Sequence, residues 1–135
     1  MTILFRAKAI NRNDNLRSTY KNGDWVYGLV TRLYDEDYEN LPAEMTDING
    51  ISGIKVDHTT IGQFIGKIDK NNNMVFTGDI TTVEGEDIYG IVKYREDKAA
   101  FFVENNQDGD YVGETWDTDV IVVGNIYDNP ELLNI

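Results

Sequence analysis

Apolar residues recur at every second position along most of this chain, and this spacing constrains the fold more than any other feature. Trp25–Leu33 shows it most clearly, with aromatic or apolar residues at 25, 27, 29 and 33. Such alternation is typical of β-strands. Clusters of Asn, Asp and Gly interrupt it about every 8–12 residues, a pattern typical of all-β sandwiches and barrels. We therefore expect a mainly β fold of short antiparallel strands.

The same pattern predicts where the strands and turns lie. Strands are expected over residues 2–10, 25–33, 51–56, 60–65, 74–76, 78–84, 88–94, 99–104 and 120–127. Turns are expected over residues 11–15, 22–24, 69–73, 85–87 and 95–98, because Asn, Asp and Gly tolerate turn conformations. Residues 34–50 form a long acidic loop, with a helical turn predicted near Pro42–Thr46. Asp128–Leu133 predicts one short C-terminal helical turn, because an Asx cap precedes Pro130 and its leucines can cover the core.

Alternation also predicts the two faces of the first strands. In residues 2–10, Phe5 shares one face with Ala7 and Ala9, while Arg6 and Lys8 share the other. In residues 25–33, the face that carries Trp25 and Tyr27 is the more aromatic. Core packing is the first expectation for that face. Single-strand nucleic-acid binding is the alternative, because bases stand nearby in the sequence.

Charge is distributed unevenly along the chain. The 135 residues hold 24 acidic and 12 basic side chains, a formal net charge of −12. Residues 1–32 hold six bases and two acids, a net charge of +4, whereas the remainder holds six bases and 22 acids, a net charge of −16. Two interpretations stay open: a solvated acidic surface, or an acidic face that binds a partner. Contact between the basic end of one copy and the acidic body of another would suit homo-oligomers.

The residue inventory excludes several kinds of site. The chain has no cysteine and one histidine, His58, so disulfides, thiolate ligands and His-pair metal sites are excluded. Gly62–Lys67 has neither the spacing of a phosphate-binding loop nor the hydroxyl residue that follows its lysine. Asp69–Asn73 begins like a calcium loop, but Met74 and Ile80 stand where Gly and Glu are needed. We expect no cofactor and no metal.

Catalysis would have to depend on carboxylates. The candidate pairs are Asp108 with Asp110 and Asp117 with Asp119, which share a strand face if the chain is extended there. With 24 acids, such pairs arise readily by chance. We therefore expect a protein that is not an enzyme and has no catalytic residues, and a carboxylate-dependent enzyme is the alternative.

No apolar run approaches the roughly 20 residues that span a bilayer. The first residues have no basic segment ahead of an apolar core, as a signal peptide would. We expect a cytoplasmic protein that has no membrane partner.

Two long motifs resemble the YopX family of phage and prophage proteins. One is Val56–Lys70 with its continuation Phe76–Ile80, and the other is Val123–Leu133. The opening Phe5-Arg6-Ala7 and the Trp25–Gly28 strand also look like the start of that family. The chain departs from the family at His58, where Pro is usual, at Asn72, where the turn usually contains Gly, and at Thr77, where Glu is common. The resemblance implies a β-rich protein of Gram-positive phages or prophages, in an infected or lysogenic host, with no established catalytic residues.

The glycines and Asp79 of these motifs fit turns and close backbone approaches, and a ligand site over Gly62–Asp79 is the alternative. Gly78–Ile80 and Tyr89–Val92 also look like the early strands of an SH3-like barrel. We expect one YopX-like domain over residues 1–135. It would comprise an N-terminal β section at 1–58, with the acidic loop 34–50, and an SH3-like barrel region at 59–135.

We expect a non-enzymatic phage accessory protein that acts through protein–protein contacts and self-assembly, with a host or phage protein as a further partner. The candidate interaction residues are Phe5, Arg6, Lys8, Trp25 and Tyr27. Residues 2–10 could also add to the sheet of a neighbouring copy. One alternative is a nucleic-acid-binding protein that uses Arg6, Lys8, Arg12, Arg17, Lys21 and Arg32. Another is an acidic mimic of nucleic acid. The net charge makes nucleic acid the less favoured partner.

Overall fold

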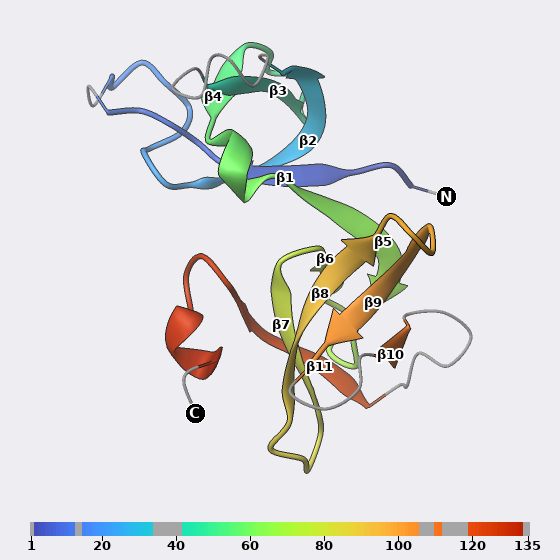
Figure 1. Ribbon diagram of the computed structural model, residues 1–135. Coiled ribbons are helices and arrows are strands. Elements are labelled where there is room, and N and C mark those ends of the chain that lie inside the picture. The colour runs from blue at the N-terminus through green and yellow to red at the C-terminus, as the bar shows by residue number, and fades with distance from the viewer. Residues whose placement is uncertain (1, 13–14, 34–41, 106–109, 112–118, 134–135) are drawn as a thin grey trace. The chain divides into compact units, whose positions relative to one another are not determined.

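The computed structural model describes residues 2–12, 15–33, 42–105, 110–111 and 119–133, and it is mainly β (Figure 1). The strands are β1 (Phe5–Lys8), β2 (Trp25–Arg32), β3 (Ala43–Asp47), β4 (Ile54–Val56), β5 (Gly62–Ile68), β6 (Met74–Phe76), β7 (Asp79–Val83), β8 (Tyr89–Arg95), β9 (Ala100–Glu104), β10 (Asp110–Tyr111) and β11 (Val120–Asn125). Single 3-10 turns follow β4, as η2 (His58–Thr60), and β11, as η3 (Pro130–Leu133). The predicted fold class is confirmed, including the short C-terminal turn, whose two leucines are half-buried.

The chain divides into two compact units, Met1–Gln63 and Phe64–Ile135, and the division falls within β5. We call them the N-terminal and C-terminal units. Each has a core made of its own residues. The N-terminal core is built on Ala7, Ala9, Val26, Ala43, Met45 and Val56. The C-terminal core is built on Ile65, Val75 and Val92.

In the N-terminal unit, antiparallel strands follow the order β4-β3-β2-β1, and the first residues of β5 pair with the start of β1. The edge of β4 that does not pair with β3 pairs with the residues just after β1. Ala9 bridges Val56, and the Ile10 amide donates to the Lys55 carbonyl at 2.8 Å. β1 therefore has a strand on both sides, at Tyr27 and at Gly62. The prediction that residues 2–10 offer a free edge to a neighbour is wrong for Phe5 and Arg6.

β2 buries the face opposite to the one expected. Val26 is fully buried and pairs with Ala7, whereas Tyr27 is 36% exposed and Leu29 is 50% exposed. Gly28 explains the choice, because a Cβ there would lie 2.0 Å from the Thr46 carbonyl oxygen of β3. The inward face of β2 is thus the face that carries Gly28, where β3 lies close. The face that carries Tyr27 and Leu29 points outward.

β3 lies where we predicted a helical turn near Pro42–Thr46, so that prediction is wrong. Ala43, Met45 and Asp47 are buried, and Glu44 and Thr46 between them are half-buried. The alternation is that of a strand, and burial of Met45 against the core outweighs the polar composition. The acidic loop predicted over 34–50 therefore contains a strand, and residues 34–41 lie outside the described part of the chain.

In the C-terminal unit, β6 pairs with β5, and a five-stranded antiparallel sheet has the order β10-β9-β8-β7-β11. The predicted hairpin around residues 95–98 is confirmed as β8–β9. The register of β11 on β7 shifts between Val122 and Gly124, as at a β-bulge. The SH3-like barrel is not confirmed, because β10 and β11 end this sheet on opposite sides without pairing to each other in the described residues.

Candidate functional site

The outward face of β1 and β2 brings together four of the five predicted interaction residues. Arg6 pairs with Tyr27 and Lys8 pairs with Trp25, so their side chains share one face. The Arg6 guanidinium carbon lies 4.6 Å from the Trp25 ring centroid, and Lys8 Nζ lies 5.3 Å from it. Phe5 is the exception, because it pairs with Gly28 on the inward face and packs against the N-terminal core.

This face combines exposed apolar surface with two cations that are themselves covered, because Arg6 is 6% exposed and Lys8 is half-buried. Trp25 is half-buried, and the exposed Tyr27 and Leu29 follow it along β2. A cation this close to an indole ring gains about 0.5–1 kcal/mol at an exposed site and more where it is desolvated, which restrains the side chain. We call Arg6, Lys8, Trp25, Tyr27 and Leu29 the β1–β2 face. Its exposed part is apolar, at Tyr27 and Leu29, and the half-buried Lys8 is the more accessible of its two cations.

A second feature of the N-terminal unit was not predicted from sequence. A pocket of about 620 Å³ opens between the loop that follows β1 and the segment that leads into β4. Its lining comprises residues 9–12, 15, 17–20, 42 and 51–55. Arg12, Arg17 and Lys55 are among them, and none of these lining residues is an Asp or Glu. We call it the basic pocket.

Asparagine side chains hold the loop that forms one wall of the basic pocket. Asn11 Nδ2 donates to the Asn15 and Tyr20 carbonyl oxygens at 3.2 and 3.0 Å, and Asn11 Oδ1 accepts from the Asn15 amide at 3.0 Å. Asn22 Oδ1 accepts from the Asn11 amide at 2.8 Å. The Arg17 amide donates to Asn15 Oδ1 at 3.1 Å. The predicted turn chemistry of Asn11 and Asn15 therefore fixes the backbone beside the two arginines.

Tyr20 fastens the end of this loop to β3. Its hydroxyl donates to Asp47 Oδ2 at 2.6 Å, and Asp47 Oδ1 accepts from the amides of Asn49 and Ile51 at 3.0 and 2.9 Å. Burial and the hydrogen bond to Asp47 raise the pKa of the Tyr20 phenol to about 12. The bond from Tyr20, with those from the backbone amides, holds the pKa of the Asp47 carboxyl below its usual value against the opposing effect of burial.

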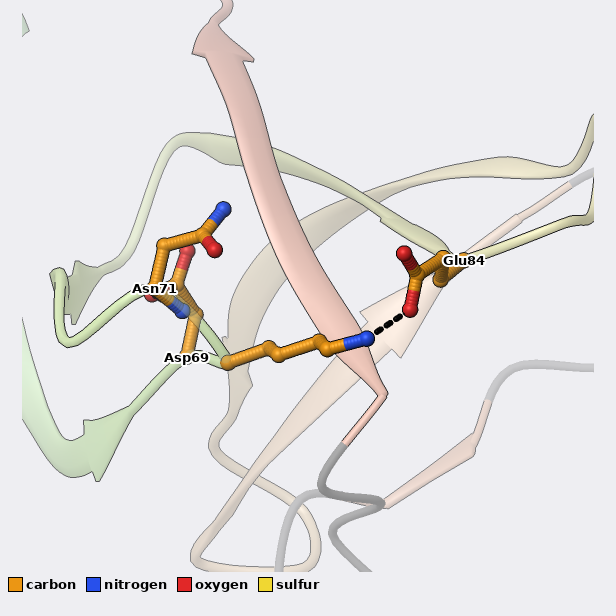
Figure 2. Close-up of polar contacts among 4 residues, drawn as sticks. Asp69, Asn71 and Glu84 are labelled. Carbon is orange, nitrogen blue, oxygen red and sulfur yellow. Dashed lines mark hydrogen bonds and ion pairs between the residues drawn. The ribbon is translucent and has the colours of Figure 1, made fainter.

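The end of the first family motif forms a turn of the C-terminal unit. Asp69 is 5% exposed, and its Oδ1 accepts from the amides of Asn71 and Asn73 at 2.9 and 2.7 Å. Its Oδ2 accepts from the Val122 amide of β11 at 2.9 Å and from Asn73 Nδ2 at 3.2 Å. Figure 2 shows Asp69 with Asn71 at this turn, and the neighbouring ion pair between Lys70 and Glu84. The carboxylate closes the turn and fastens it to β11.

The second family motif is held by two asparagines. Asn125 Oδ1 accepts from the amides of Tyr127 and Asp128 at 3.0 and 2.9 Å, and Asn129 Oδ1 accepts from the Asn125 amide at 3.2 Å. A Cβ at Gly124 would lie 2.5 Å from Asn129 Oδ1. Asp79 is buried and accepts from the Phe76 amide at 2.8 Å, as expected for a turn residue. The side-chain oxygens of Asp69, Asp79, Asn125 and Asn129 thus accept hydrogen bonds from the backbone.

Three of the four carboxylates named for catalysis lie outside the described side chains. Asp108 and Asp117 lie outside the described residues, as does the side chain of Asp110, and Asp119 is exposed. His58 is exposed at the start of η2. Within the described ranges, no three His, Cys, Asp or Glu side chains gather in a way that could hold a metal ion. No helix in the described part of the chain has the length and apolar character to cross a membrane.

Comparison with known proteins identifies the family. No curated protein matches the sequence. The family model described as YopX protein matches residues 5–134, which is nearly the whole chain and includes both motifs. The chain therefore belongs to the YopX protein family.

Proposed function

We propose that this protein is a non-enzymatic phage or prophage accessory protein that acts in the bacterial cytoplasm through protein–protein contacts, including contacts between its own copies. The β1–β2 face is the observation that supports this proposal. Its Tyr27 and Leu29 side chains are exposed on a regular strand. Exposed aromatic and aliphatic anchors beside a cation are typical of interface cores.

The charge distribution supports a second copy as one occupant of this face. Residues 1–32 carry a net charge of +4 and the remainder carries −16. The basic segment of one copy is therefore attracted to the acidic remainder of another copy. The exposed acids of the C-terminal unit include Glu84, Glu86, Asp87 and Glu96. Contact of the β1–β2 face with such a surface is heterologous, and closes into a ring when the rotation permits.

Light scattering coupled to size exclusion tests self-assembly. At tens of micromolar in low salt, we expect a mass that is a multiple of 15.4 kDa and that falls as salt is raised. Leu29→Asp should weaken association at least tenfold, because burying a leucine contributes about 1.5–3 kcal/mol. Leu16→Asp is the matched control, because Leu16 is 97% exposed on a loop outside this face. A wild-type mass of 15.4 kDa at every salt concentration would reject self-assembly.

The two nucleic-acid alternatives are tested separately. A gel shift at low salt should show no complex with DNA or RNA, because most of the chain repels phosphate. A salt-dependent shift that Lys8→Gln abolishes would favour the nucleic-acid-binding alternative. Affinity capture from host lysate, compared between the wild type and Leu29→Asp, tests for a host or phage protein on this face. Capture of a nucleic-acid-binding host protein in competition with DNA would favour the acidic mimic.

A further inference from the structure

The basic pocket has an electrostatic character opposite to that of the chain. Acids outnumber bases two to one in the sequence, yet three cations and no acid stand among the described lining residues. The ion pairs of Lys70, Lys93 and Arg95 use Glu84, Glu104 and Asp97, and none of these acids lines the pocket. The described lining therefore offers three cations to a ligand.

The pocket also offers neutral donors and an apolar wall. Ser18, Thr19 and Ser52 carry hydroxyl groups at its lining. Ile10, Ile51 and Ile54 contribute aliphatic surface. A bare inorganic ion would use the donors and leave that surface unused. A ligand with an anionic group and an organic portion uses both.

Hydrogen bonds within the protein hold the described parts of the loop that carries Arg12 and Arg17. Asn11 Nδ2 donates to the Tyr20 carbonyl oxygen, the Arg17 amide donates to Asn15 Oδ1, and the Tyr20 hydroxyl donates to Asp47 Oδ2. Tyr20 itself lines the pocket. Backbone held in this way lowers the entropic cost of binding.

We propose that the basic pocket binds a small organic phosphate, such as a nucleotide. Arg12, Arg17 and Lys55 pair with the phosphate oxygens, and the isoleucines and Tyr20 cover the organic portion. Arginine suits this ligand because its planar guanidinium donates two parallel hydrogen bonds to phosphate. The site shares no residue with the β1–β2 face, so it goes beyond the proposed function and can fail or succeed independently of it.

Isothermal titration of the full chain at low salt tests the proposal, with ADP, inorganic pyrophosphate and citrate as probes. We expect ADP to bind, pyrophosphate to bind at least threefold more weakly, and citrate more weakly still. Raising the salt concentration should weaken all three. Arg17→Gln and Lys55→Gln should each weaken ADP binding about tenfold, the effect of losing a charge-assisted hydrogen bond.

Lys21→Gln is the matched control, because Lys21 is an exposed cation of the same loop that does not line the pocket. It should leave ADP binding within twofold of the wild type. Amide spectra of each variant check that the fold is intact. No binding of ADP at millimolar concentration would overturn the proposal, as would an equal loss of affinity in Lys21→Gln. Citrate or pyrophosphate binding as tightly as ADP would overturn the assignment to an organic phosphate.

Discussion

Replacement of Asp69 by asparagine tests the structural role of the first family motif. The carboxylate is 5% exposed and accepts four hydrogen bonds, two on each oxygen. Asparagine has one acceptor oxygen, so Oδ1 can keep the amides of Asn71 and Asn73. Its NH₂ group would then face the Val122 amide and Asn73 Nδ2, which are donors as well.

The expected cost follows from those two lost bonds. A hydrogen bond to a charged group contributes about 1.5–3 kcal/mol, and the longer contact to Asn73 Nδ2 belongs at or below the low end of that range. Asp69→Asn should therefore lower the free energy of unfolding of the C-terminal unit by about 3 kcal/mol. The Val122 amide should exchange its hydrogen faster, because Asp69 is its acceptor.

Urea unfolding followed by circular dichroism, with exchange measured at the Val122 amide, checks both expectations. Asp87→Asn is the matched control, because Asp87 is exposed, and it should change the free energy of unfolding by less than about 0.5 kcal/mol. A loss of less than about 1 kcal/mol in the free energy of unfolding of Asp69→Asn would refute the reasoning. Two hydrogen bonds to a buried carboxylate should contribute more than that.

Three further predictions concern other contacts. Burial raises the Asp69 pKa, but bonds from Val122 and Asn73 outweigh it and hold that pKa below its usual value. The ionised Asp69 carboxylate should therefore stabilise the fold fully above about pH 4, and this stabilisation should be lost as the pH falls through the folded pKa. In an acid titration of Asp69→Asn, the free energy of unfolding should not show this loss. Tyr20→Phe should cost about 1 kcal/mol in thermal or urea unfolding, and ultraviolet titration of the wild type should find one tyrosine with a pKa of about 12. Gly28→Ala should cost at least about 2 kcal/mol in urea unfolding, because its Cβ would lie 2.0 Å from the Thr46 carbonyl oxygen, and a loss below 0.5 kcal/mol would mean that β3 moves aside freely.

Turns were predictable because their chemistry is local. Asp69 reaches Asn71 and Asn73, and Asn11 reaches Asn15, all within four residues of the chain. The strand alternation likewise predicted the β8–β9 hairpin, since its two strands are neighbours in sequence.

The inward face of β2 was not predictable in this way. Both of its faces alternate with apolar residues, so spacing alone does not choose between Val26 and Tyr27. The choice depends on β3, which approaches closest at Gly28. A glycine inside an otherwise good strand was the available signal, because it marks a close backbone approach.

The basic pocket was missed because its two walls are far apart in sequence. Arg12 and Arg17 precede Lys55 by about 40 residues, and no local pattern links them. The cluster of asparagines around Arg12 indicated an ordered loop, but what that loop faces depends on tertiary structure.

The bond between Asp69 and Val122 joins residues 53 positions apart, and it has a consequence for synthesis on the ribosome. The N-terminal unit ends at Gln63, and the residues that pack in its core lie no later than Ile61, so that unit can fold while translation continues. The C-terminal unit needs β11 both for β7 and for the Asp69 turn. Until β11 emerges, β7 presents a bare edge on the nascent chain, and this interval is when a chaperone, or a second copy during synthesis, would meet that edge.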